Sequence, residues 1–231
     1  MAVQRLTPQL KALLAAKLLR LTANEESSRL KVRAVLATLA PQARAVAQRE
    51  PVRAGGDYRL EPLSVESEKS ARPDILSVQN GSRIQYRLYN DGDRPVYFAV
   101  FCSDSAGRLS AIGAEGKDSD SWKSRAIAPG ENLSVPAAGA LGWAVSGAIG
   151  LATTQIIFSE TPFARTLAAM EMQPARDTVP VVLLNPLNVA RAVLEDLHAA
   201  SIPVQKVGIS TDDWALDVRV WATLSFVYRV V

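Results

Sequence analysis

The stretch from Gly81 to Ile112, GSRIQYRLYNDGDRPVYFAVFCSDSAGRLSAI, most constrains the fold because it combines two strand patterns with two turns. Its first run, RIQYRLY, alternates apolar and polar residues, which predicts a strand with one face buried and one face in water. The NDGD tetrapeptide that follows contains residues that favour chain reversal. The next run, from Val96 to Cys102, is apolar on both parities and therefore predicts a central strand covered on both faces.

Further short apolar runs, separated by turn signals, continue to the C-terminus. A Pro129-Gly130 turn precedes strand-like runs near 133–135, 141–145 and 154–158, and residues from Val218 to Val230 alternate without a slip. Between them, Asn185-Pro186 favours the start of a helix that continues to about Ala200. These signals together predict an antiparallel β-sandwich-like domain that carries one late helix near residues 186–200.

The N-terminal residues have helical spacing instead. Thr7-Pro8 is typical of a helix start, and we expect the leucines that follow to pack on the rest of the protein. These leucines form one stripe: Leu6, Leu10, Leu13, Leu14, Leu18 and Leu21. A break at residues 24–27 predicts a second helix that Pro41 limits, with a short helical continuation at residues 42–48. Its inward residues are Leu30, Ala34, Val35 and Leu39. A linker signal at Gly55-Gly56 then divides a helical hairpin (1–55) from a β-rich domain (56–231), which makes the chain α+β.

The uncharged span from Leu133 to Ser159 is long enough to cross a membrane and has to be interpreted. Glycines and one proline interrupt it, and its neighbours Glu131 and Glu160 are acidic where Lys or Arg is usual. We therefore expect buried strands there and no membrane span. A single cysteine and the lack of a signal peptide favour the cytoplasm.

Catalytic patterns are weak in this sequence. The one cysteine, Cys102, lies in a run predicted to be buried, and the one histidine, His198, lies near a helix end, so a Cys/His hydrolase pair is not expected. Neither a GxxxxGK[ST] nor a GxGxxG motif is present, and no cofactor or metal site is expected. The four tryptophans at positions 122, 143, 214 and 221 would suit a carbohydrate platform only if they were exposed.

Basic residues are concentrated near the N-terminus, where residues 1–50 hold nine Lys/Arg against three Asp/Glu. The candidate partner-binding residues are Lys11, Lys17, Arg20, Arg29, Lys31 and Arg33. An acidic protein partner, an acidic lipid surface or phosphate, and an ordinary solvated helix face all fit this pattern. Because residues 1–50 contain no aromatic side chain for base stacking, nucleic acid is not expected. The sequence leaves the oligomeric state open.

Several segments together resemble a known family. They are ALLAAKLLRLTANEESSRLKVRAVL, RIQYRLYNDGDRPVYFAVFCSDSAGRL, APGENLSVP, IIFSETPF and the C-terminal LDVRVWATLSFVYRVV. They resemble the C-terminal accessory region of cyanobacterial caspase-like peptidases, an uncharacterised β-rich domain that follows the peptidase domain. The peptidase's His-Gly segment and Asp-x-Cys context do not match here, since Cys102 lies in Val-Phe-Cys-Ser and precedes His198. The resemblance thus implies a non-enzyme, either a fragment that begins after a protease or a stand-alone relative.

The leading hypothesis is a non-catalytic protein-interaction or regulatory module, with a protein partner that is acidic or caspase-like. Two alternatives stay open: a structural or linker component of a larger assembly, and a carbohydrate-binding β-sandwich.

Overall fold

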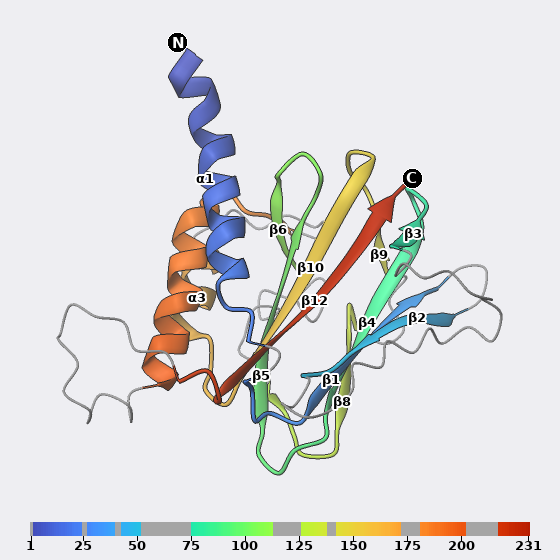
Figure 1. The fold of residues 1–231 in the computed structure, drawn as a ribbon, viewed down its shortest axis with the longest axis vertical. Coiled ribbons are helices and arrows are strands. Elements are labelled where there is room, and N and C mark those ends of the chain that lie inside the picture. The colour runs from blue at the N-terminus through green and yellow to red at the C-terminus, as the bar shows by residue number, and fades with distance from the viewer. Residues whose placement is uncertain are drawn as a thin grey trace.

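The computed structural model of the chain describes residues 2–24, 27–39, 43–51, 75–112, 126–137, 142–171, 181–201 and 217–231. Within these ranges the chain forms two β-sheets and three α-helices, an α+β arrangement (Figure 1). The helices lie together on one side of the molecule, next to the larger sheet.

In the described part of the chain, the smaller sheet has five strands. Its order is β2 (Arg44–Arg49), β1 (Val32–Thr38), β4 (Arg83–Asn90) and β8 (Asn132–Val135), with the short β9 (Trp143–Ala144) also paired to β4. All of these pairs are antiparallel.

The larger sheet has seven strands among the residues that the structure describes. Its order is β11 (Val181–Val182), β6 (Leu109–Ile112), β5 (Val96–Ser103), β10 (Gly150–Ser159), β12 (Trp221–Val230) and β3 (Leu76–Val78), with β7 (Ala126–Ile127) paired to β5. The pairing of β12 with β3 is parallel, and the other pairs are antiparallel.

One apolar core joins the two sheets. Strands of the smaller sheet contribute Leu36 and Tyr86, and strands of the larger sheet contribute Ile156 and Phe226. The rings of Tyr86 and Phe226 lie 5.4 Å apart between centroids, so the two sheets meet directly there.

A second apolar core lies on the opposite face of the larger sheet, under the helices α1 (Ala2–Arg20), α2 (Ala164–Glu171) and α3 (Pro186–Ala200). Strand β5 places Phe101 in this core and Val100 in the core between the sheets. The prediction that this run is covered on both faces is confirmed.

The predicted helical hairpin is wrong in its second half. Residues 32–38 and 44–49 form strands β1 and β2 of the smaller sheet. The reason is tertiary pairing: β1 lies between β2 and β4, and it buries Val32, Ala34 and Leu36 at every second position. A helix would have buried residues three or four apart instead. Helix α1 also begins earlier than predicted, at Ala2, so that Pro8 lies inside it.

Other predictions are confirmed. Helix α3 has the predicted bounds, and the C-terminal strand forms as β12 beside β10. Strands β8, β9 and β10 lie in the uncharged 133–159 span, as expected. The late helix is not the only one, since α2 precedes it. The predicted boundary near residue 55 lies outside the described residues.

Candidate functional site

Helix α1 is fixed to the protein mainly through its C-terminal half. Ala15 and Leu19 are fully buried against the helical core, and α1 packs along α3. Small alanine side chains on this face let the two helices approach closely. None of residues 6–14, in contrast, is buried. The N-terminal end of α1 accordingly extends beyond the rest of the molecule (Figure 1).

The turn after α1 binds the beginning of β12. The side-chain amide of Asn24 donates to the carbonyls of Val218 and Trp221 at 2.7 and 2.6 Å and accepts from the N–H of Thr223 at 3.0 Å. The indole N–H of Trp221 also donates to the carbonyl of Thr22 at 2.9 Å. These contacts hold the C-terminal end of α1 against the beginning of β12. They thereby fix the direction in which the outer face of the helix points.

The outer face of α1 is apolar. We call it the leucine face; its members are Leu6, Leu10, Leu13, Leu14 and Leu21. A repeat of about 3.6 residues per turn places them opposite Ala15 and Leu19. Leu10 exposes 62% and Leu21 exposes 65% of its surface, so most of the leucine face is uncovered within the described part of the chain. Leu13 lies next to Gly107 of the turn between β5 and β6. The sequence stripe was predicted to pack inward, and only Leu18 of that stripe lies against the helical core.

Three of the six predicted partner-binding residues lie on this helix. Lys11, Lys17 and Arg20 are exposed, and no ion pair joins them to a carboxylate of the described residues. The helical repeat places Lys17 in the middle of the leucine face. Helix α1 contains no Asp or Glu, so its outer surface is both apolar and cationic.

The other three lie elsewhere. Arg29 and Lys31 are exposed in the connection to β1, whereas Arg33 is on β1, where its guanidinium pairs with Asp91 at 3.2 Å and lies 3.8 Å from the ring centroid of Tyr89. The charge of Arg33 is thus already matched within the protein. The six residues therefore do not form one patch on one element.

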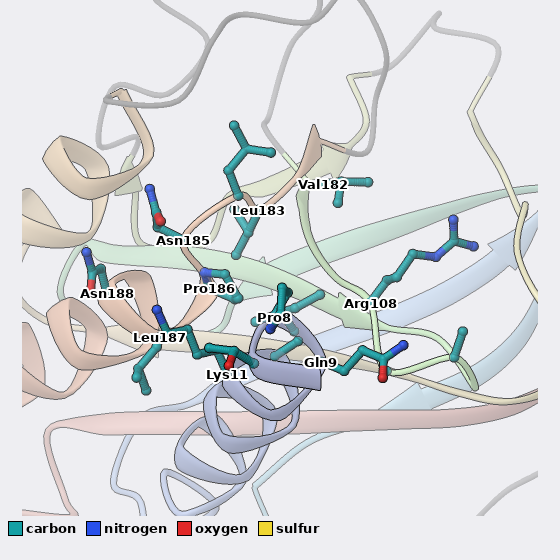
Figure 2. Close-up of a pocket in the computed structure, with 16 residues that line it drawn as sticks. Pro8, Gln9, Lys11, Arg108, Val182, Leu183, Asn185, Pro186, Leu187 and Asn188 are labelled. Atoms are coloured by element: carbon teal, nitrogen blue, oxygen red, sulfur yellow. The ribbon is translucent and has the colours of Figure 1, made fainter. Parts of the chain in front are cut away.

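A groove of about 570 Å³ runs beside the N-terminal half of α1. Three segments line it: α1 through Thr7, Pro8, Gln9, Lys11 and Ala12; the β5–β6 turn and the first residue of β6 at residues 106–109; and residues 182–188, which run from β11 into α3 (Figure 2). Lys11 and Arg108 are its charged lining residues. Arg108 is paired with Asp104, whose carboxylate lies 2.8 Å from the Nε atom of Arg108. The other cation of the groove, Lys11, forms no ion pair with a carboxylate of the described residues.

Cys102 is part of a buried hydrogen-bond network and not of a reactive site. Its sulfur lies 3.2 Å from the Thr154 hydroxyl, which also accepts a hydrogen bond from Tyr86 at 2.7 Å. Burial raises the pKa of the Cys102 thiol far above its ordinary value, which opposes thiolate formation. His198 lies on α3, on the other side of the larger sheet, so the structure does not bring the two together.

The tryptophans that the structure describes do not form a platform. Trp143 exposes 5% and Trp221 exposes 1% of its surface. Trp122 and Trp214 lie outside the described residues. A sugar-binding surface would need exposed, coplanar rings, which the two described residues do not supply.

Sequence reasoning identified the leucines and lysines of α1 but placed the leucines on the wrong side. The signal that could have found the exposed face is the run of alanines at positions 12, 15 and 16, because small residues are favoured where helices pack closely. The groove was missed because it is formed by three segments far apart in the sequence.

Comparison of the chain with protein-family models, curated proteins and solved structures finds no match. Among the described helices, none has the length and hydropathy of a membrane span. The described residues also contain no group of three His, Cys, Asp or Glu side chains arranged to hold a metal ion.

Proposed function

We propose that this protein is a non-catalytic interaction module that holds a protein partner on the leucine face of α1. The observation that carries the proposal is that exposed leucines gather on one face of a helix whose opposite face is already packed. Contiguous exposed apolar surface of this kind marks interaction sites in proteins. The two sheets, which we interpret as a β-sandwich, serve as the rigid base that presents the helix.

The buried state of Cys102 and its separation from His198 support a role without a Cys/His nucleophile. The resemblance to the accessory region of cyanobacterial caspase-like peptidases stays a prediction; under it, the partner would be a caspase-like protein in the cytoplasm. A structural component of a larger assembly would use the same face. Carbohydrate binding has less support, because Trp143 and Trp221 are buried.

Site-specific photo-crosslinking tests the proposal. A photoreactive amino acid replaces Leu10 on the leucine face, and in a matched variant it replaces Val227, an apolar residue of β12 that is also exposed. We expect one defined protein to be crosslinked in native cells from position 10 and not from position 227. No adduct at position 10, or the same adducts at both positions, would refute the proposal.

A variant pair separates binding from folding. Leu10→Asp alters an exposed residue and should leave the free energy of unfolding within about 0.5 kcal/mol of that of the unsubstituted protein. With the photoreactive amino acid placed at Leu14, which is also on the leucine face, the same substitution should abolish the crosslink. Leu19→Ala removes a fully buried side chain and should cost about 2–5 kcal/mol. If Leu10→Asp instead destabilises the protein as much as Leu19→Ala, the leucine face is part of the fold and not a binding surface.

A further inference from the structure

Resting on the proposed function, we propose that the partner contributes an acidic amphipathic helix that lies along α1. Its apolar side chains contact the leucine face, and a carboxylate pairs with Lys17.

The spacing of the leucines suits a helical ligand. Leu6, Leu10 and Leu13 stand at i, i+4 and i+7, the spacing with which one helix presents its apolar face to another. The N-terminal end of α1 extends beyond the rest of the molecule (Figure 1). Leu13 lies next to Gly107 of the β5–β6 turn, so a second helix would lie along Leu6 and Leu10 and meet that turn near Leu13.

The charge of α1 selects the partner's composition. Arg5, Lys11, Lys17 and Arg20 are its ionisable residues, all of them basic. Lys17 interrupts the leucine face, so a purely apolar partner would have to cover its ammonium group without compensation. A partner carboxylate at that position pairs with Lys17, and further acidic residues at the rim match Lys11 and Arg20.

The same charges argue against two other occupants. A second copy would bring another α1 with four basic residues and no acidic one, so pairing of the two helices would bring like charges together. An anionic membrane would attract the lysines, but the ammonium group of Lys17 would then enter the face that has to insert. Residues 1–50 also lack the Trp, Tyr or Phe that anchor interfacial helices.

The test uses a fluorescently labelled synthetic helical peptide with leucines at the i, i+4, i+7 spacing and glutamates at its flanking positions. A matched peptide has lysines in place of the glutamates, and vesicles of phosphatidylserine provide the lipid surface. Fluorescence anisotropy with the full chain should show at least about tenfold tighter binding of the acidic peptide, and this preference should shrink as salt is raised.

Charge reversal then tests the role of Lys17. Lys17→Glu should weaken binding of the acidic peptide about fivefold, as expected for one exposed ion pair replaced by a repulsion. Arg87→Glu makes the same charge change at an exposed position on β4 and should leave the affinity unchanged. Equal binding of both peptides, an equal effect of both variants, binding to vesicles instead of peptides, or a dimer of the chain that Leu10→Asp dissociates would each overturn the inference.

The two proposals can fail separately. If crosslinking from position 10 captures a partner but the acidic peptide does not bind, the interaction role stands and the acidic-helix inference falls. If neither experiment gives a signal, both are refuted.

Discussion

The side chain of Asn24 should be among the most important single polar groups for stability. Among the described strands, the N-terminal half of β12 pairs with β10 on one side only, because β3 pairs with no residue of β12 before Tyr228. Asn24 fills part of this open edge with two donated hydrogen bonds and one accepted hydrogen bond. The substitution Asn24→Ala removes all three and leaves the N–H of Thr223 buried without a partner.

The expected cost follows from these contacts. A hydrogen bond contributes about 0.5–1.5 kcal/mol net, and a buried group left unpaired costs about 1–3 kcal/mol, so the three contacts together predict a loss of about 3–5 kcal/mol. This is a large part of the stability of an ordinary domain, about 5–15 kcal/mol, but it should leave the variant folded.

Urea unfolding followed by circular dichroism measures this loss, with Ser27→Ala as the control because Ser27 is exposed in the same connection. Hydrogen exchange provides a local readout, since the amide of Thr223 should exchange faster in Asn24→Ala. A loss below about 1 kcal/mol, or one equal to that of Ser27→Ala, would refute the assignment of Asn24 as the anchor of this edge.

Three further predictions follow from buried polar groups. Asp196→Ala should lower the free energy of unfolding by about 1–3 kcal/mol in urea titrations, because its carboxylate accepts from the N–H and the hydroxyl of Thr166 at the start of α2. Thr154→Val should cost a similar amount, since it leaves the hydroxyl of Tyr86 without its buried acceptor. Burial raises the folded-state pKa values of Cys102 and Tyr86, so both groups stay neutral in the folded protein at a pH where they ionise in the unfolded chain. Their contribution to the free energy of unfolding is complete at neutral pH and should be lost as the pH rises above about 9, so the urea midpoint should be lower at pH 10 than at neutral pH. Native Cys102 should also resist alkylation.

The strands that could be predicted are those whose pattern has one interpretation. The alternation of RIQYRLY and of the C-terminal run matches period two, and the structure buries alternate residues of β4 and β12 facing the inter-sheet core. The fully apolar VYFAVFC run needs cover on two faces, and the second sheet and the helices provide it. In these segments local pattern and tertiary environment agree.

Strand β1 could not be predicted because its pattern has two interpretations. Val32 and Leu36 are four residues apart, which fits a helix face, and they also share parity with Ala34, which fits a strand face. Alanine, leucine and arginine in the segment favour a helix. The pairing of β1 with β4 decides the outcome, and that partner is about fifty residues away in the sequence.

The leucines of α1 show why the site could be found only in part. Periodicity alone identifies an apolar face but does not say what covers it. In this chain the smaller face, with Ala15 and Leu19, meets α3, because a close approach between helices requires small side chains. The larger leucine face is left outward, and burying it would gain more than burying the alanines, since transfer free energy grows with apolar area. Under the proposed function, a partner covers the larger face, which the described part of the protein leaves exposed.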